Sequence, residues 1–120
     1  MPHLRLDYTT NITEEINFQE LFHHCHEALQ QIIGVDIAKC DSQARQVEDF
    51  FIGKGEKENA FVHLTIYLFE GRSKEMKQRI GTIILPLLEK AFSNSLKKLN
   101  LHLVIFLRDL EKDFYFKNNS

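Results

Sequence analysis

The sequence has 120 residues, which is enough for one compact domain and too few for two. Hydrophobic residues make up 43% and charged residues 27%, a balance typical of a soluble globular protein. The net charge of -2 argues against the basic surface that broad nucleic-acid binding requires. No apolar stretch is long enough to span a bilayer, and no signal peptide is recognisable. Two cysteines without a CxxC pair favour a reduced, cytoplasmic protein.

The first half of the chain has the pattern of a strand, a helix and a second strand. Residues 3–8 alternate between apolar and polar side chains, which predicts a half-buried strand. Thr13 and the two glutamates after it predict the start of a helix, and Gly34 predicts its end. Between them apolar side chains recur at steps of three and four residues, as on a helix of about five turns. Residues 37–47 are interpreted as a strand.

The second half repeats this order after a glycine-rich loop at residues 53–57. Residues 60–69 carry apolar side chains in both phases of the alternation, which predicts a central strand covered on both sides. Ser73 is positioned to cap a second helix. Pro86 inside this helix predicts a kink rather than a break, because the apolar stripe continues in phase. Residues 101–108 alternate again and form the last predicted strand.

These elements predict an α+β fold over residues 1–120, a single domain made of two β-α-β halves. Each crossover makes its two strands parallel, so the halves form a four-stranded mixed sheet with two helices on one face, a two-layer sandwich. The other face of the sheet has no predicted helical cover although the third strand supplies apolar side chains to both faces. We therefore expect oligomerisation to cover it.

Pro2 is the residue whose position points most directly to chemistry. Aminopeptidases remove Met1 when the next residue is small, and the chain would then begin with a secondary amine. Such an amine acts as a general base or acid when its pKa lies near the working pH, and burial beside apolar groups lowers that pKa. Proline at position 2 also occurs for reasons of processing alone, and a retained Met1 would leave an amide nitrogen that cannot act as a base.

Four segments of the chain occur in a combination known from one family. They are MPHLRLDY at residues 1–8, NAFVHLT at residues 59–65, the Gly71-Arg72-Ser73 turn and FKNN at residues 116–119. Together they resemble the 5-carboxymethyl-2-hydroxymuconate isomerase family of the tautomerase superfamily, over essentially the whole chain. The resemblance implies a tautomerase-like fold, a homotrimer and a small anionic substrate. The reaction it implies is a proton shift in an unsaturated hydroxy or keto carboxylate, with no metal or organic cofactor.

The resemblance also implies roles for two residues. Pro2 matches the family's amino-terminal proline, the general base and acid that moves the proton. Arg72 matches an arginine expected to hold a substrate carboxylate or to stabilise developing negative charge. A guanidinium offers a fork of donors that fits a carboxylate, and the helix N-terminus predicted beside Arg72 also favours anions.

One position departs from the family pattern. Asp41 stands where the family typically carries a second arginine, and its carboxylate would repel a dianionic substrate. Arg45 shares the predicted strand face of Asp41 but lies about 13 Å further along. Arg108 is another cation available to an anionic site, and His63 lies within the resembling segment as a possible neighbour of the site. The departure keeps a second function open, a tautomerase-fold trimer that serves as a binding or interaction protein.

Two further clusters have both a functional and a structural interpretation. His23, His24 and His26 could contribute to a metal site, but a solvated helix face is the simpler interpretation because no further ligand is placed by the sequence. The aromatic run at residues 114–116 could stack on nucleic acid, but without a basic surface we expect it to dock the tail onto the domain.

Overall fold

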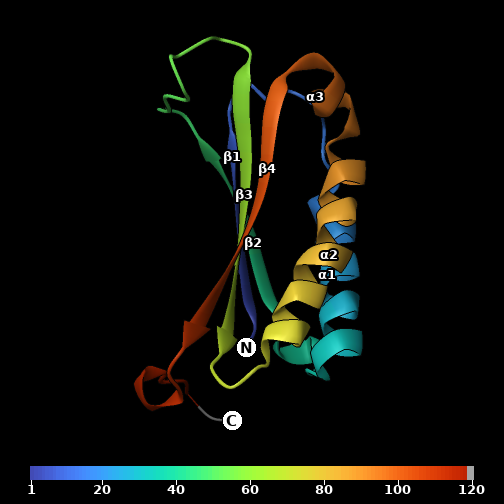
Figure 1. Ribbon diagram of the computed structural model, residues 1–120, viewed down its shortest axis with the longest axis vertical. Helices are drawn as coiled ribbons and strands as arrows, with labels where there is room; N and C mark the ends of the chain where they lie inside the picture. Colours follow the sequence, from blue (N-terminus) through green and yellow to red (C-terminus); the bar gives the residue numbers. More distant parts are fainter. Residues whose placement is uncertain (119–120) are drawn as a thin grey trace.

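The chain folds into a four-stranded sheet with helices α1 and α2 against one face (Figure 1). The structure is a computed structural model, and it describes residues 1–118. Its strands are β1 (His3–Thr9), β2 (Asp41–Val47), β3 (Asn59–Phe69) and β4 (Asn100–Leu110). Its helices are α1 (Phe18–Ile33), α2 (Lys74–Ala91) and α3 (Ser93–Lys98), with 3-10 turns at Ile37–Lys39 and Lys112–Phe114.

The strands lie in the order β2-β1-β3-β4. β1 is parallel to β2 and antiparallel to β3, and β3 is parallel to β4. This arrangement confirms the predicted α+β fold, with two β-α-β halves joined into one mixed sheet. The N-terminus and the tail that follows β4 lie at the same end of the sheet (Figure 1).

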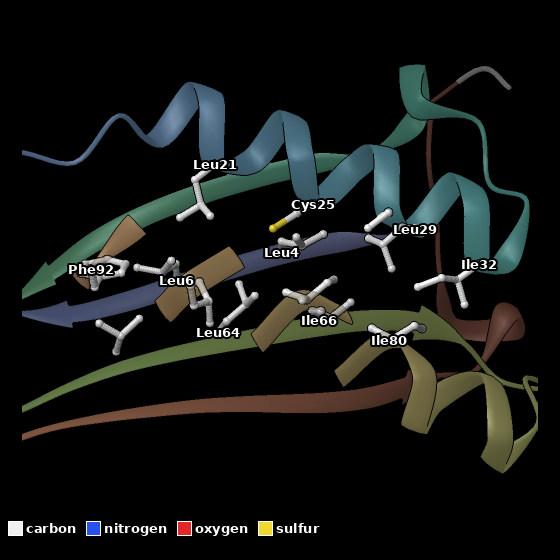
Figure 2. Packing of buried hydrophobic residues seen from close by; sticks show 14 of the residues in the cluster. Leu4, Leu6, Leu21, Cys25, Leu29, Ile32, Leu64, Ile66, Ile80 and Phe92 are labelled. Atoms are coloured by element: carbon white, nitrogen blue, oxygen red, sulfur yellow. The ribbon is translucent and has the colours of Figure 1, made fainter. Parts of the chain in front are cut away.

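The core lies between the sheet and the two long helices (Figure 2). Alternate side chains of β1 and β3 point into it, and α1 and α2 meet them with residues spaced three and four apart. The buried members include Leu4, Leu6, Leu21, Leu29, Leu64, Ile66, Ile80, Ile84 and Leu88. Cys25 is also buried here, and burial raises the pKa of its thiol to about 12, so it packs as a neutral side chain.

Helix α1 begins later than the sequence pattern predicts. The first helical residue is Phe18 rather than one next to Thr13, because the side chain of Asn17 accepts a backbone N–H of the first turn. Glu14 is used elsewhere: its carboxylate accepts the backbone N–H of Ser95 at 2.9 Å, at the start of α3. The acidic segment that predicted the entry to α1 therefore stabilises the N-terminus of another helix.

Other helices and strands also differ from the sequence prediction at their ends. β2 begins at Asp41, not at residue 37, because a 3-10 turn capped by Asp36 precedes it. Helix α3 was not predicted, since its six residues are too few to show a periodic stripe. The structure confirms both predicted caps: Gly34 ends α1 with φ 70°, and the Ser73 side chain accepts the first-turn N–H of α2. α2 continues through Pro86.

The opposite face of the sheet is covered by neither long helix. The side chains that alternate with the core residues of β1, β3 and β4 gather there, and most of them are charged or aromatic. They line a hollow of about 510 Å³ that includes Arg5, Asp7, His63, Tyr67, Phe106 and Arg108. We call this surface the open face. Among the described residues, no helix combines the length and the apolar character that crossing a bilayer requires.

Candidate active site

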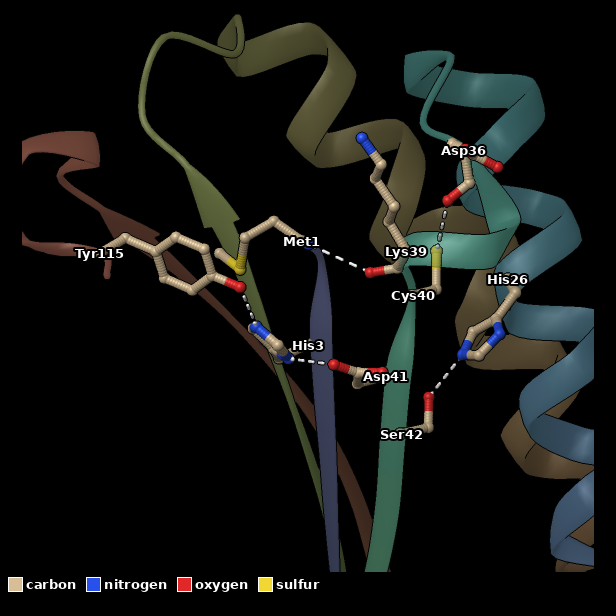
Figure 3. Close-up of polar contacts among 9 residues, drawn as sticks. All are labelled: Met1, His3, His26, Asp36, Lys39, Cys40, Asp41, Ser42 and Tyr115. Atoms are coloured by element: carbon tan, nitrogen blue, oxygen red, sulfur yellow. Dashed lines mark hydrogen bonds and ion pairs between the residues drawn. The ribbon is translucent and has the colours of Figure 1, made fainter. Parts of the chain in front are cut away.

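Pro2 is fully buried and lies immediately before β1. Its carbonyl oxygen accepts the backbone N–H of Asp41 at 3.1 Å, which joins the start of β1 to the start of β2. The amine of Met1 donates a hydrogen bond to the carbonyl oxygen of Lys39 at 3.1 Å (Figure 3). The chain terminus is therefore held against the residues that precede β2 instead of extending away from the fold, as termini often do.

A hydrogen-bonded cluster lies next to Pro2, and sequence reasoning missed it. His3 Nε2 is 3.1 Å from the Tyr115 hydroxyl, and His3 Nδ1 is 3.4 Å from a carboxylate oxygen of Asp41 (Figure 3). Tyr115 comes from the tail after β4, so three distant parts of the chain meet here. Burial lowers the pKa of His3, and the positive N-terminal amine lowers it further.

Arg72 lies at the same end of the sheet as Pro2. Because β3 is antiparallel to β1, the end of β3 lies beside the start of β1, with Tyr67 opposite His3. The loop that follows β3 carries Arg72 to the C-terminus of α1, where its Nη1 donates to the carbonyl oxygen of Ile33 at 3.2 Å. The guanidinium thus caps α1, whose last turn contains no basic residue of its own.

The contact between Arg72 and Ile33 predicts a measurable stability effect. Arg72→Ala is expected to lower the free energy of unfolding by about 1 kcal/mol, because a charged hydrogen bond to the helix end is lost. Urea unfolding followed by circular dichroism measures the change. The matched control is Arg79→Ala on the exposed side of α2, which should change stability by less than about 0.5 kcal/mol. Equal losses in the two variants would contradict a stabilising role for the contact.

Arg108 shares a cross-strand row with the cluster. His3 on β1 lies opposite Tyr67 on β3, and Tyr67 lies opposite Arg108 on β4. All three side chains belong to the open face, where Tyr67 and Arg108 line the hollow. Arg108 is therefore separated from His3 by two strand spacings, about 10 Å.

Arg45 and His63 lie in a different row. Both stand opposite Asp7, four residues along β1 from His3, which corresponds to about 13 Å. Arg45 Nε donates to Asp7 at 3.1 Å. The His63 ring stacks on Phe61 at 4.0 Å, and burial lowers the pKa of His63. Within one copy of the chain, neither residue is brought next to Pro2.

The two remaining clusters have structural partners. His23 pairs with Glu27 on the surface of α1, and His26 contacts the Ser42 hydroxyl at 2.6 Å. Within residues 1–118 no group of three or more potential ligands is arranged to hold a metal ion. In the aromatic run, Tyr115 contacts Phe69 as expected for a docked tail, while its two neighbours Phe114 and Phe116 are exposed.

Comparison with known proteins identifies the family. The model of the 5-carboxymethyl-2-hydroxymuconate isomerase family matches residues 2–120. The chain belongs to this isomerase family. It is 27% identical over 120 residues to the 5-carboxymethyl-2-hydroxymuconate Delta-isomerase of Escherichia coli, a match that covers 100% of this chain and 95% of the relative.

Solved structures agree on the fold. A 5-carboxymethyl-2-hydroxymuconate isomerase from Deinococcus radiodurans R1 is similar with a TM-score of 0.86 and 24% identity, over 99% of this chain and 90% of that one. A fused 4-OT wild type symmetric trimer is similar with a TM-score of 0.77 and 18% identity, over 98% of this chain and 93% of that one. The predicted tautomerase-like fold is thereby confirmed.

Membership of the isomerase family confirms the predicted enzyme class and favours it over an interaction protein without catalysis. The roles of Pro2, Arg72, Arg45, Arg108 and His63 stay predictions. His3 and Tyr115 could not be paired in advance, because the two residues lie 112 positions apart in the sequence. The one available signal for His3 was its place directly after Pro2.

Proposed function

We propose that this isomerase shifts a proton within an unsaturated hydroxy or keto carboxylate similar to 5-carboxymethyl-2-hydroxymuconate, with the amine of Pro2 as general base and acid. The observation that carries the proposal is the position of Pro2. It is fully buried at the first residue before a central strand, in a chain of an isomerase family. Removal of Met1 would convert its nitrogen into a secondary amine at that place.

The surroundings of Pro2 suit a proton carrier. Burial beside apolar groups disfavours a charged ammonium, so the enclosed position of the ring favours the neutral amine that can accept a proton. A conjugated enol already holds the electrons that the new C–H bond needs, so the reaction uses neither a metal nor an organic cofactor. Protonation at carbon by Pro2 and loss of the enol proton complete the shift.

The substrate carboxylate is held by Arg72 in this proposal. One N–H of its guanidinium is used by the carbonyl of Ile33, and the fork has further donors for an anion. The N-terminus of α2, which begins two residues later at Lys74, adds a favourable dipole. Arg108 supplies a second positive charge across the sheet, whereas Arg45 and His63 would join the site only from a neighbouring copy.

We also propose that the open face is covered by two further copies of the chain in a homotrimer. Phe106 is 41% exposed and lines the hollow of this face, where its ring meets that of His63 edge-on at 5.6 Å; Phe61, Tyr67 and Val104 lie on the same side of the strands. A surface so rich in apolar groups is unusual on an isolated protein. The fold shared with a fused 4-OT trimer supports this assembly.

The trimer proposal predicts the effect of a charge on the open face. Phe106→Asp is expected to dissociate the assembly, because a carboxylate would be buried between copies without a partner. Sedimentation velocity at fixed protein concentration measures the molecular mass. Leu96→Asp is the matched control, since Leu96 is equally exposed at 38% but lies on α3, away from this face. A wild-type protein that sediments as a monomer would contradict the proposal.

The experiment that tests the enzymatic function combines two measurements. Intact mass on protein purified without a tag determines whether Met1 is absent, and the processed protein is then assayed with the enol tautomer of phenylpyruvate by ultraviolet absorbance. We expect processed protein to accelerate ketonisation and protein with a retained Met1 to be inactive. Activity that does not depend on processing would contradict the role of the Pro2 amine.

A further inference from the structure

The cluster beside Pro2 joins three elements through two contacts of one imidazole. His3 from β1 lies between Asp41, the first residue of β2, and Tyr115 from the C-terminal tail (Figure 3). The same Asp41 donates its backbone N–H to the carbonyl oxygen of Pro2. The cluster is therefore connected to the catalytic residue of the proposed function both along the chain and across the strands.

The tail is shaped so that Tyr115 alone turns inward. A 3-10 turn at Lys112–Phe114 precedes it, and its ring meets Phe69 edge-on, with centroids 5.1 Å apart. The ammonium of Lys112 lies over the same Phe69 ring at 5.5 Å. Both aromatic neighbours of Tyr115 are exposed, so the tail specifically delivers this hydroxyl to His3.

The contact of Asp41 with Nδ1 favours one tautomer of His3, and the tautomer sets the direction of the hydrogen bond to Tyr115. An ionised carboxylate only accepts hydrogen bonds, so the ring nitrogen that faces it, Nδ1, carries the proton of the neutral imidazole. Nε2 is then an acceptor and takes the hydrogen bond of the Tyr115 hydroxyl. In this state the lone pairs of the Tyr115 oxygen are available to a donor that enters the site.

We propose that Tyr115, His3 and Asp41 form a proton relay for the oxygen end of the reaction, while the Pro2 amine serves the carbon end. The proposal rests on the proposed function of Pro2. Tyr115 is the group that contacts the substrate, His3 stores the proton and Asp41 positions His3. The relay also explains how a carboxylate fits into this site: Asp41 stabilises an imidazolium instead of facing the substrate directly.

The bonds of the step balance. The enol O–H bond breaks as its proton moves to the Tyr115 oxygen, and the original Tyr115 proton moves to Nε2 of His3. The oxygen electrons form C=O, the C=C electrons move along the conjugated chain, and a new C–H bond takes its proton from the Pro2 ammonium. The products are a ketone, a neutral amine and an imidazolium, which returns its proton to Pro2 through water.

The charges around His3 suit this cycle. Burial lowers the pKa of His3, and the positive amine of Met1 and Lys117 in the tail lower it too, whereas Asp41 on β2 raises it. Tyr67 of β3 is the titratable group opposite His3 on the third side. The lowered pKa of His3 favours the neutral imidazole that the first step of the relay requires.

The test uses the full chain without Met1 and three conservative variants. Tyr115→Phe removes the hydroxyl and keeps the ring on Phe69, His3→Gln cannot store a proton, and Asp41→Asn removes the charge. With the enol of phenylpyruvate, Tyr115→Phe and His3→Gln are expected to lower kcat about 10²-fold with KM within about 3-fold of wild type. Tyr8→Phe, near the other end of β1, and Asp49→Asn, exposed after the end of β2, are the controls and should retain wild-type kcat.

The pH profile separates a relay from a purely structural cluster. His3 must be neutral to accept the proton, so the acidic limb of kcat should move to lower pH in Asp41→Asn, where the charge that raises the pKa of His3 is gone. A structural role would lower activity without moving that limb. Nitrogen-15 NMR of the His3 ring should show a proton on Nδ1 in the wild type, a measurement that needs no turnover.

The possible failures are distinguishable. If Tyr115→Phe and His3→Gln keep wild-type kcat while Pro2→Ala loses activity, the relay is wrong and the function of Pro2 stands. A proton on Nε2 of His3 would also overturn the relay, whatever the activity. If Pro2→Ala keeps full activity, the proposed function fails and the relay fails with it.

Discussion

Replacing Pro2 by alanine is expected to lower kcat/KM for an enol carboxylate by about 10²-fold in protein that lacks Met1. The proline ring is fully buried, and it fixes the nitrogen in one direction and limits its hydration. Alanine would place a smaller, more hydrated primary amine on a freely rotating terminus. Steady-state assays across pH measure the loss and show whether the remaining activity needs a more alkaline solution.

A second proline offers the matched control for this experiment. Pro86 lies within α2 and is exposed on the side of the helix that faces away from the core. Pro86→Ala should leave kcat/KM within about 2-fold of wild type. The variant should also gain stability, because a proline inside a helix removes one hydrogen bond and crowds the preceding turn. Equal activity of Pro2→Ala and wild type would remove the amine from the mechanism.

Phe92→Ala is expected to lower the free energy of unfolding by about 3–5 kcal/mol. Phe92 has no exposed surface, and its ring lies 6.4 Å from that of Phe18 and 6.5 Å from that of Tyr8. It also stands at the junction of α2 and α3, so its removal leaves a cavity where two helices meet the sheet. Urea unfolding at fixed protein concentration should show a lower midpoint with an unchanged slope.

Phe116→Ala is the matched control for the loss of a phenyl group. Phe116 is 87% exposed in the tail, so the same truncation there should change stability by less than about 0.5 kcal/mol. A loss below about 1 kcal/mol in Phe92→Ala would mean that the surrounding rings of Tyr8 and Phe18 collapse into the vacated space, in contrast to the rigid packing expected of this core.

The architecture could be predicted because its signals are local. Alternation along β1, β3 and β4 and the three-to-four spacing along α1 and α2 are properties of short windows, and each was recognised. The start of α1 was misplaced because the signal at Thr13 and Glu14 is real but belongs to another helix. Glu14 binds Ser95, which lies 81 positions away in the sequence. The residues that neighbour Glu14 in the sequence do not indicate this contact.

The residues of the candidate site could likewise be predicted only where the signal was local. Pro2 and Arg72 could be singled out because each lies at a recognisable position, the start of a strand and the residue before a helix cap. The positions of Arg45 and His63 relative to Pro2 depend on strand register, which the order of elements does not specify. The partnership of His3 with Tyr115 depends on how the tail folds back, and only the three-dimensional structure contains that information.

The burial of Pro2 determines when an aminopeptidase could reach Met1. An aminopeptidase must bind Met1 and the peptide bond that follows it in an extended conformation. In the folded chain, however, Pro2 is buried and the terminal amine donates a hydrogen bond to the carbonyl oxygen of Lys39. β1 also lies in the middle of the sheet, so its release requires most of the fold to open. We therefore expect that any removal of Met1 takes place before β1 is built into the sheet, and that a chain that folds with Met1 in place keeps it.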